Sequence, residues 1–443
     1  MRLPEYAARA LCRLENAGFE AWAVGGCVRD SLRGAEPHDF DLCTAARPEE
    51  MLRVFAGERL IKTGLRHGTL TVLTEGGPLE ITSFRADGSY SDGRHPDGVR
   101  FVSSIRDDLA RRDFTVGAMA WHPERGLFDP FGGREDLENR VLRAVGDPDM
   151  RFTEDALRIL RAVRFASELG FSIEENTAAA MERQAGRLAL IAPERVREEL
   201  TRLLCGRWVQ RTLLGCTAVI GAALPELRPM FGCTQDNPHH CYDVWGHTVR
   251  AVGQVPPEPC LRWAMLLHDS GKPACKTVDE QGVGHFRGHP KASRALAERL
   301  LPRLRFSNED SERILLLVEQ HDRPLGDSDK LVRRRLAQIG EARFRDLLMI
   351  KKGDAVGQNT QPWDVGTLQG TERLLNEVLR QNGCLSLRRL AVNGRDMQTL
   401  GFTGEKIGEM LRFLLDAVLD DPARNDRETL LRLARTEMEE QHG

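Results

Sequence analysis

The stretch AWAVGGCVRDSLRGAEPHDFDLCT, Ala21 to Thr44, decides the fold of this chain. An apolar run enters a Gly25-Gly26 turn, a helix start follows, and a second extended run carries Asp39 and Asp41. Because side chains alternate between the two faces of a strand, we expect both aspartates on one face and Phe40 on the other. The order strand, glycine turn, helix, strand therefore predicts that the turn and the two acids meet at one site.

Each part of this stretch suits a polyphosphate. Two neighbouring carboxylates repel unless a cation lies between them, and hard oxygen ligands suit Mg²⁺ bound together with a substrate phosphate. Gly25 and Gly26 let the backbone approach a polyphosphate, and amides at the helix start, helped by Arg29, donate to it. We therefore predict a nucleoside triphosphate site with metal-assisted phosphoryl chemistry. A tight turn followed by a solvated D-x-D is the alternative, which the two motifs at this spacing disfavour.

The pattern GG-x-x-RD followed by D-F-D resembles the nucleotidyltransferase superfamily of DNA polymerase beta. Within it, the sequence is similar to the class II tRNA nucleotidyltransferases (CCA-adding enzymes) and their bacterial poly(A) polymerase relatives. The resemblance implies an α+β fold: a small mixed-sheet head like that of DNA polymerase beta, followed by helical parts. We expect a head over residues 1–145, an all-α neck with a base-reading helix over 146–205, a helical body with an HD-type domain over 206–360, and a helical, RNA-binding tail over 361–443.

Bulk properties limit the remaining choices. A chain of 443 residues is expected to form two to four domains, and 41% hydrophobic with 29% charged residues is typical of a soluble globular protein. No apolar stretch is long enough to cross a bilayer, so we expect no membrane partner, and the start MRLPE is no signal peptide. Ten cysteines without a C-x-x-C pair indicate the reducing cytoplasm. A net charge of −3 requires any RNA-binding basic surface to be local, and the oligomeric state is not specified.

Further runs of the predicted head read as strands of one sheet. They are Arg59 to Thr63, Gly68 to Leu73 and Leu79 to Phe84. Glu80 lies in the last run, where its carboxylate could share the face of the two aspartates, and it resembles the third, accessory carboxylate of the superfamily. A surface glutamate is the equal alternative.

Two further segments of the head carry the resemblance. Ala86 to Val99 resembles the flexible loop of CCA-adding enzymes that is associated with adding the terminal A, which favours CCA or A addition over CC addition. Ile105 to Met119 is expected to be helical, and its RRDFT resembles the family's ribose and triphosphate motif. Arg111 and Arg112 would then hold phosphates, and Asp113 would accept from ribose hydroxyls. In the same segment, Gly117 stands where the family usually has Asn.

The segment TEDALRILRAVRFASELGF from Thr153 predicts one long helix with Thr153 as its N-cap and Gly170 at its end. A polar stripe recurs at every third residue, formed by Asp155, Arg158, Arg161 and Arg164.

Base edges give this stripe a function. A carboxylate that accepts from an exocyclic amine and a guanidinium that donates to the neighbouring ring nitrogen together select C and A over G and U. E-D-x-x-R, here Glu154, Asp155 and Arg158, resembles the family's protein template for CTP and ATP, and Arg161 and Arg164 match further family arginines. A plain neck helix is the alternative.

Histidine density rises between Pro238 and Ala355, with His239, His240 and His285 among its members. LLHDSGKP, Leu266 to Pro273, resembles the HD phosphohydrolase motif. The resemblance implies a divalent transition metal that activates water against a phosphoester, and HD helices kept only as scaffolding are the alternative. The implied ligands are His268 and Asp269 with His247 and Asp354, and His289 and His321 match positions that can hold a second metal.

In the C-terminal half, Leu390 to Leu411 resembles the family's last element, and Arg333 to Arg335 is the tightest basic cluster. We expect these helices to grip the outer half of tRNA, with a solvated charged face as the alternative for the arginines.

The resemblance implies template-independent addition of C, C and A to the 3′ end of tRNA from CTP and ATP. The 3′-hydroxyl would attack the α-phosphate, pyrophosphate would leave, and two Mg²⁺ ions would lie on Asp39 and Asp41. The rivals are an A-adding or CC-adding enzyme or a poly(A) polymerase, an HD phosphohydrolase acting on RNA ends, and a non-catalytic RNA-binding scaffold. KTGLRHGTLTV, Lys62 to Val72, looks more like the CCA-adding version than the polymerase version.

Overall fold

The computed structural model describes residues 1–87, 99–236, 241–358, 365–381 and 383–440. The chain forms two compact units, Met1–Pro225 and Glu226–Gly443. Most of the expected loop from Ala86 to Val99, together with His239 and His240, lies outside the described residues. All ten cysteines are free thiols. Within the described ranges, no helix combines the length and the apolar character that crossing a membrane requires.

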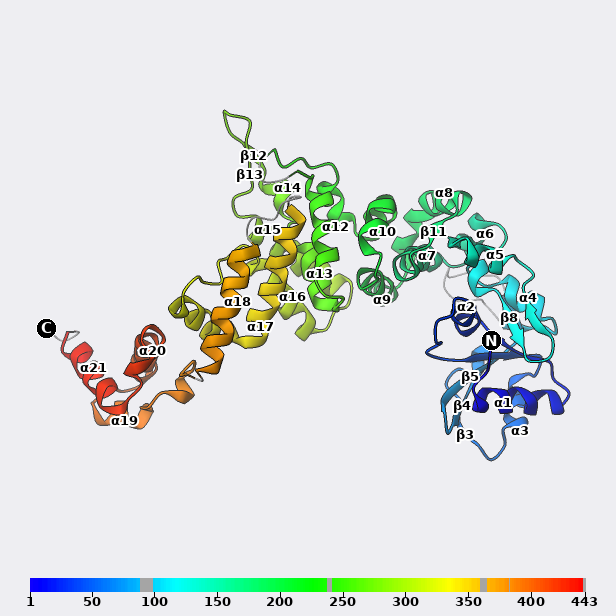
Figure 1. Cartoon of the computed structure of the whole chain (residues 1–443), viewed down its shortest axis with the longest axis horizontal. Coiled ribbons are helices and arrows are strands. Elements are labelled where there is room, and N and C mark those ends of the chain that lie inside the picture. The colour runs from blue at the N-terminus through cyan, green and yellow to red at the C-terminus, as the bar shows by residue number, and fades with distance from the viewer. Residues whose placement is uncertain (88–98, 237–240, 359–364, 382, 441–443) are drawn as a thin grey trace. The chain divides into compact units, whose positions relative to one another are not determined.

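The first unit opens with a seven-stranded mixed sheet, which confirms the α+β head (Figure 1). The strand order is β3-β4-β5-β2-β1-β8-β9, in which β2 and β5 are parallel and the other neighbours antiparallel. The strands are β1 (Ala21–Val24), β2 (Asp41–Thr44), β3 (Arg59–Ile61), β4 (Thr69–Thr74), β5 (Gly77–Ser83), β8 (Ala120–His122) and β9 (Gly126–Phe128).

Short helices cover this sheet. The apolar stripe of α1 (Glu5–Asn16) is buried, as its period predicts, and Leu14 and Leu42 are fully enclosed. The remaining head elements are α2 (Gly26–Leu32), α3 (Pro48–Val54), η1 (Leu65–His67), the hairpin β6 (Arg85–Asp87) and β7 (Val99–Phe101), α4 (Ile105–Ala110), η2 (Thr115–Gly117) and α5 (Gly133–Glu138).

The expected helix from Ile105 to Met119 is wrong beyond its first turns. The helix α4 ends at Ala110, and Phe114 is extended (φ −130°, ψ 147°). Phe114 pairs with Ala144 across an antiparallel bridge, and the amide of Val145 donates to the carbonyl of Asp113 at 3.1 Å. Strand pairing with a distant segment therefore overrides the local helical pattern.

The neck helix is also divided, contrary to the prediction of one helix from Thr153. The helix α6 (Pro148–Glu154) starts earlier, because Asp147 caps it and proline occupies its first position. At Asp155 the backbone is extended (φ −142°, ψ 103°), and α7 (Leu157–Leu169) begins afterwards and ends at Gly170 as predicted. The other neck elements are β10 (Val141–Leu142), β11 (Ser172–Ile173), α8 (Glu175–Gln184), η3 (Ala185–Leu190), α9 (Pro193–Leu204), α10 (Val209–Gly215) and α11 (Thr217–Ala223).

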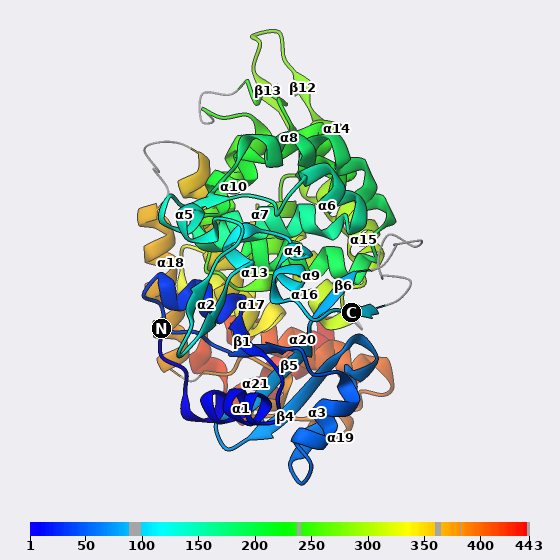
Figure 2. The same ribbon diagram turned by 90° about the vertical axis from the view of Figure 1, so that its right-hand side faces the viewer.

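Among its described residues, the second unit is helical apart from one small hairpin. In it, α12, α13 and α17 pack against one another, Trp263 of α13 is fully buried, and the β12–β13 hairpin projects from the helices (Figures 1 and 2). Its elements are η4 (Pro225–Met230), α12 (Val244–Gln254), α13 (Pro259–Leu267), α14 (Lys272–Cys275), β12 (Thr277–Val278), β13 (Gly284–His285), α15 (His289–Arg303), α16 (Asn308–Gln320), α17 (Asp329–Gln358) and α18 (Val365–Arg380).

A separate apolar cluster holds the last helices together. They are η5 (Leu387–Arg389), α19 (Gly394–Thr399), α20 (Glu405–Asp420), η6 (Pro422–Arg424) and α21 (Arg427–Glu440). The arginine cluster expected to grip RNA is largely engaged within the unit: Arg333 is buried and donates to the carbonyl of Leu419 at 2.8 Å, and Arg334 pairs with Asp420 at 2.7 Å. A cation at the end of α20 also suits that helix's dipole.

Candidate active site and histidine cluster

The acids of the head lie where the two central parallel strands run side by side. Asp41 opens β2 and is the direct partner of Glu80 in β5, so both side chains lie on one face of the sheet. Asp39 is exposed and precedes β2, contrary to the prediction of a strand position, because β1 ends at Val24, opposite Asp41, and offers no further ladder partner. Phe40 turns toward Tyr6 of α1, with ring centroids 6.5 Å apart.

Three carboxylates, of Asp39, Asp41 and Glu80, lie close enough to interact electrostatically. Burial, followed by the carboxylates of Asp39 and Glu80, raises the pKa of Asp41 to about 6, while Arg112 opposes the rise. A carboxylate whose pKa is raised by neighbouring carboxylates is relieved by a cation, and hard oxygen ligands on an open face suit a divalent ion that is shared with a phosphate. The donor set of the head therefore fits a divalent metal.

The glycine turn is built around Arg112. Gly25 has φ +74°, and a Cβ there would lie 2.9 Å from Nη1 of Arg112. The same nitrogen donates to the carbonyl of Gly117 at 3.3 Å. A guanidinium packed on a bare turn, within electrostatic reach of Asp41, is suited to holding a phosphate. Arg29 is less available, since it forms a bidentate pair with Asp30 at 2.8 and 2.9 Å.

Asp108 is a positioning residue that the sequence reasoning missed. Its fully buried carboxylate accepts from Arg111 at 2.9 and 3.0 Å and from Arg112 at 3.4 Å. Burial alone would raise the pKa of Asp108, but the two guanidiniums outweigh it and lower that pKa. The available signal was an acid three and four residues before a pair of arginines on a helix.

Asp113 joins the head to the neck. Its Oδ2 accepts from Nε of Arg161 at 2.6 Å, and its Oδ1 accepts from the amide of Phe114 at 2.9 Å. Burial opposes ionisation, but Arg161 lowers the pKa of Asp113. At Gly117, a Cβ would meet only Oδ1 of Asp113 at 3.8 Å, so a side chain fits there. The predicted ribose acceptor is thus bonded to the predicted base-reading helix.

The two predicted base readers are held from opposite sides. Asp155 pairs with Arg195 at 3.1 Å and accepts from the amide of Leu157 at 3.0 Å. Arg158 is nearly buried, donates to Glu154 at 2.5 Å, and reaches the carbonyl of Arg111 at 2.9 Å. The structure therefore fixes both side chains, and it ties Arg158 directly to the arginine motif of the head.

Arg164 differs from the rest of the stripe. Its side chain is buried, and it donates to Glu199 at 2.5 Å and to Glu168 at 2.7 Å. Its guanidinium carbon lies 3.9 Å from the centre of the Phe165 ring. A guanidinium enclosed by two carboxylates and a ring is a packing element, so we interpret Arg164 as structural and not as a nucleotide contact.

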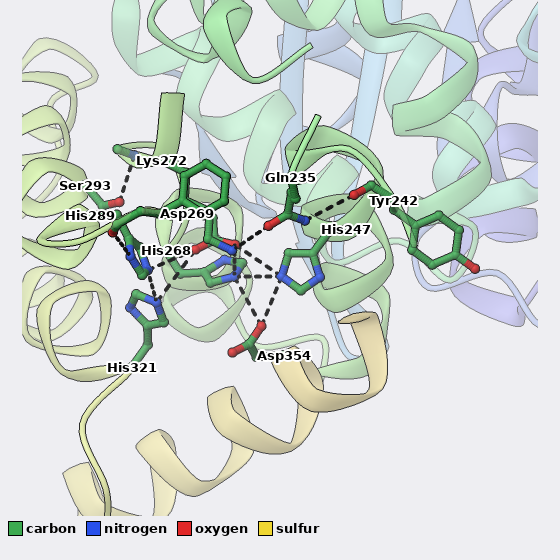
Figure 3. Close-up of polar contacts among 12 residues, drawn as sticks. Gln235, Tyr242, His247, His268, Asp269, Lys272, His289, Ser293, His321 and Asp354 are labelled. Carbon is green, nitrogen blue, oxygen red and sulfur yellow. Dashed lines mark hydrogen bonds and ion pairs between the residues drawn. The ribbon is translucent and has the colours of Figure 1, made fainter. Parts of the chain in front are cut away.

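The second unit brings all six predicted HD residues together, although they come from five separate segments (Figure 3). Nε2 of His247 on α12 lies 3.2 Å from Nε2 of His268 and 3.0 Å from Oδ1 of Asp354 on α17. On the other side, Nε2 of His289 lies 3.2 Å from Nε2 of His321. These form two groups whose ligand atoms lie within 4.8 Å of one another: His247, His268 and Asp354, and Asp269, His289 and His321.

Asp269 lies between the two groups. Its Oδ2 is 3.2 Å from His247 and from His268, and its Oδ1 is 3.3 Å from His289. Lys272 also approaches Oδ2 at 2.7 Å and is held by Gln235 at 2.9 Å. A carboxylate with one oxygen toward each group could contribute an oxygen ligand to a metal held by either group.

The backbone fixes how these imidazoles present their nitrogens. Nδ1 of His268 contacts the carbonyl of Met265 at 2.7 Å, and Nδ1 of His289 and of His321 contact the carbonyls of Phe286 and Val318. A carbonyl only accepts, so each Nδ1 carries a proton and each Nε2 is turned into the cluster, where it can bind a metal once it has lost its own proton.

The carboxylates of Asp269 and Asp354 favour positive charge beside them. Burial opposes a charged imidazole, but Asp269 and Asp354 outweigh it and raise the pKa of His268 to about 10. Imidazole nitrogens and buried carboxylates are a donor set that fits divalent transition metals. A cavity of about 320 Å³ opens beside the cluster, and its lining includes Lys272, Phe286 and Arg287.

Comparisons with known proteins match three segments of the chain to family models. Residues 21–143 match the poly A polymerase head domain, residues 170–215 match the probable RNA and SrmB-binding site of polymerase A, and residues 239–347 match the HD domain. The nucleotidyltransferase and HD matches imply the use of divalent metal.

Relatives extend this likeness over the whole chain. A CCA-adding enzyme of Limosilactobacillus fermentum is 33% identical over 428 residues, covering 96% of this chain and 94% of that protein. A CCA-adding enzyme of Lactobacillus helveticus is 49% identical over 208 residues, covering 46% of this chain and 52% of that protein. The crystal structure of the Bacillus stearothermophilus CCA-adding enzyme in complex with CTP covers 100% of both chains, with 27% identity and a TM-score of 0.75. The chain therefore belongs to the family of CCA-adding enzymes.

Proposed function

We propose that this chain adds C, C and A to the 3′ end of tRNA from CTP and ATP, without a nucleic-acid template and with release of pyrophosphate. The observation that carries the proposal is the direct bonding between head and neck. Arg158 reaches the carbonyl of Arg111, and Arg161 pairs with Asp113. Residues suited to read a base are thus attached to residues suited to hold its triphosphate.

In the proposed mechanism, Asp39 and Asp41 would hold two Mg²⁺ ions, and Glu80 would be the accessory carboxylate beside them. When bound, these ions lower the pKa of the 3′-hydroxyl and neutralise the charge on the leaving pyrophosphate. Arg112 and the Gly25 turn hold the triphosphate in line. The 3′-oxygen then bonds to the α-phosphorus as the bond from that phosphorus to the β-phosphate oxygen breaks.

Nucleotide choice follows from Asp155 and Arg158. A carboxylate accepts from the exocyclic amine of C or A, and a guanidinium donates to the adjacent ring nitrogen. With G or U, the same groups would face a carbonyl and an N–H and would remain unpaired, which a hydrogen-bonded site rejects by large factors. The structure already holds the two side chains through Arg195 and Glu154, so little ordering is needed when the base enters.

The test uses tRNA transcripts that end at the discriminator base, at C and at CC, each incubated with one nucleotide at a time. We expect C on the first two transcripts, A on the third, and no G or U. In the variant carrying Asp155→Asn and Arg158→Gln, this discrimination should be lost. The matched control carries Asp149→Asn and Arg183→Gln, which removes an exposed Asp-Arg pair of the same unit at 2.6 Å. Unlimited A addition by the unmodified chain would instead indicate a poly(A) polymerase, and C without A or A without C would indicate a partial enzyme.

The histidine cluster favours a second activity. We propose that it binds two divalent transition metals and hydrolyses phosphoesters at RNA ends, since six ligand-type residues converge beside a cavity to which Lys272 and Arg287 also contribute. An RNA oligonucleotide with a terminal cyclic phosphate is the probe. Asp39→Ala should abolish nucleotide addition and leave hydrolysis intact, and Asp269→Ala should do the reverse. Hydrolysis that survives Asp269→Ala would refute the second activity.

We also propose that the functional parts follow the boundaries 1–145, 146–205, 206–360 and 361–443, with RNA binding in the last. A cytoplasmic location is proposed as well, which the ten free thiols support.

A further inference from the structure

A second cationic site lies in the first unit, in a cavity of about 530 Å³. Its lining comes from the end of α2, from α5 and the α5–β10 connection, from the end of α7 and the α7–β11 connection, and from the α9–α10 connection. Four guanidiniums and one carboxylate line it, in a chain whose net charge is −3. They belong to Arg33, Arg134, Arg140, Arg207 and Glu138. None of these residues belongs to the acid face or to the base readers described above.

The charges of this cavity are only partly neutralised from within the chain. Arg134 pairs with Glu138 at 3.0 Å, and Arg33 reaches Asp30 at 3.5 Å. In the described ranges, no carboxylate forms an ion pair with Arg140 or Arg207. Arg140 also has a left-handed backbone (φ +55°), which is uncommon outside glycine, and the amide of Ser172 fixes it by donating to its carbonyl at 3.0 Å. Two of the four guanidiniums that line the cavity thus have no carboxylate partner among the described residues.

Trp208 gives the cavity an aromatic wall. Its side chain is 40% exposed although it is a large apolar group. The indole packs directly on Gly170, where a Cβ would lie 2.4 Å from Nε1, and the amide of Trp208 donates to the carbonyl of Ser167 at 2.9 Å. Arg207 lies 5.7 Å from the ring centre. The ring is therefore held in place by a glycine that leaves room for it, and its open side faces solvent.

A preset aromatic surface among cations is the combination that proteins use for single-stranded nucleic acid, in which bases stack and phosphates meet arginine. We propose that this cavity binds a single-stranded segment of RNA, with a base against Trp208 and phosphates on Arg140 and Arg207. This site goes beyond the proposed function, since it is separate from the nucleotide-adding site. The segment matched to an RNA-binding region supplies Trp208 and Arg207, whereas Arg33, Arg134 and Arg140 come from outside it.

The test measures binding of a fluorescein-labelled, unstructured RNA 10-mer of C and A by anisotropy, from 50 to 300 mM salt, without nucleotides. In the variant Arg140→Glu with Arg207→Glu, we expect weaker binding and a log–log salt slope smaller by about 0.7 for each arginine lost. Trp208→Leu keeps an apolar side chain on Gly170 but removes the ring, and it should weaken binding about ten-fold, whereas Trp208→Phe should retain most of it. The control carries Arg53→Glu and Arg59→Glu, two exposed arginines of the head that lie outside the cavity.

Several results would overturn the inference. One is that the variant Arg140→Glu with Arg207→Glu binds the oligomer within two-fold of the affinity of the unmodified chain and with an unchanged salt slope. Another is that the charge-reversed variant loses affinity equally for RNA and for a base-free polyphosphate competitor, and that Trp208→Leu has no effect. That result would assign the cavity to plain anions. A third is that the doubly charge-reversed variant loses a second CTP-binding site in equilibrium dialysis but still binds the oligomer. That result would assign the cavity to free nucleotides. Nucleotide addition is assayed separately at saturating tRNA, so failure of either proposal is distinguishable from failure of the other.

Discussion

Replacing Arg164 by methionine should unfold the first unit at a lower temperature while leaving nucleotide chemistry intact. Arg164 is 2% exposed and donates to Glu199 at 2.5 Å. Removing one partner of a buried pair costs about 3–5 kcal/mol, because the other charge stays buried without compensation. Arg161 remains 3.9 Å from Glu199, so the lower end of that range applies. At roughly 2–4 °C per kcal/mol for a unit of this size, the thermal midpoint should fall by about 6–12 °C.

Three further variants give this prediction its controls. Glu199→Gln should cost less, since Arg164 keeps Glu168 at 2.7 Å. The double variant Arg164→Met with Glu199→Leu should recover most of the loss, because an apolar pair of similar volume replaces the ions. Arg202→Met removes an exposed partner of Glu168 and should cost less than about 1 kcal/mol.

The measurements are thermal unfolding by circular dichroism and CTP incorporation at 25 °C. The structural assignment of Arg164 predicts that the double variant incorporates CTP at the rate of the unmodified chain. A variant Arg164→Met that unfolds within 1 °C of the unmodified chain but no longer incorporates CTP would refute it and restore Arg164 to the nucleotide site.

Three other predictions test the glycine turn, the buried acids and the histidine cluster. Gly25→Ala should lower nucleotide incorporation far more than Gly34→Ala, measured by primer extension: both positions have positive φ, but only a Cβ at Gly25 meets Arg112, at 2.9 Å. Arg111 and Arg112 lower the pKa of Asp108 against the effect of burial, and Arg161 does the same for Asp113. The ionised carboxylates therefore stabilise the folded unit above the unfolded pKa of about 3.9. This stabilisation is lost as the pH falls through the lower folded pKa values. Circular dichroism from pH 6 to 2 should therefore show the first unit unfolding below about pH 4, with a shallower dependence in Asp108→Asn. By elemental analysis, Asp269→Ala should lose metal from both groups and His321→Ala from one, whereas His285→Ala, whose exposed ring pairs with Asp279, should lose none.

The acid face was predictable because its signals are local, and the histidine cluster because one local motif identified its family. Gly25 and Asp41 stand on either side of a short helix, and the alternation within a strand places Glu80 correctly once β5 is recognised. For the HD residues, the motif around His268 located one pair, and the resemblance supplied the distant ligands.

What sequence reasoning missed depends on long-range partners. The helix at Ile105 ends early because Phe114 pairs with Ala144, thirty residues away. A period of three placed Arg164 with Arg161 on one polar stripe, but Glu199 on α9 turns Arg164 into a core residue. Periodicity states which residues share a face of a helix, and it does not state what covers that face.

The hydrogen bond between Asp113 and Arg161 couples the head to the neck. If Asp155 and Arg158 read the base, an ill-fitting base displaces Arg158, whose guanidinium also reaches the carbonyl of Arg111. Arg111 and Arg112 share the carboxylate of Asp108, and Arg112 packs on the Gly25 turn. A mismatch at the base would thereby reach Arg112, the arginine proposed to hold the phosphates, over a chain of contacts each 3.4 Å or shorter up to Asp108. Selection then acts on the position of the α-phosphate as well as on binding, which is how discrimination enters the chemical step as well as affinity.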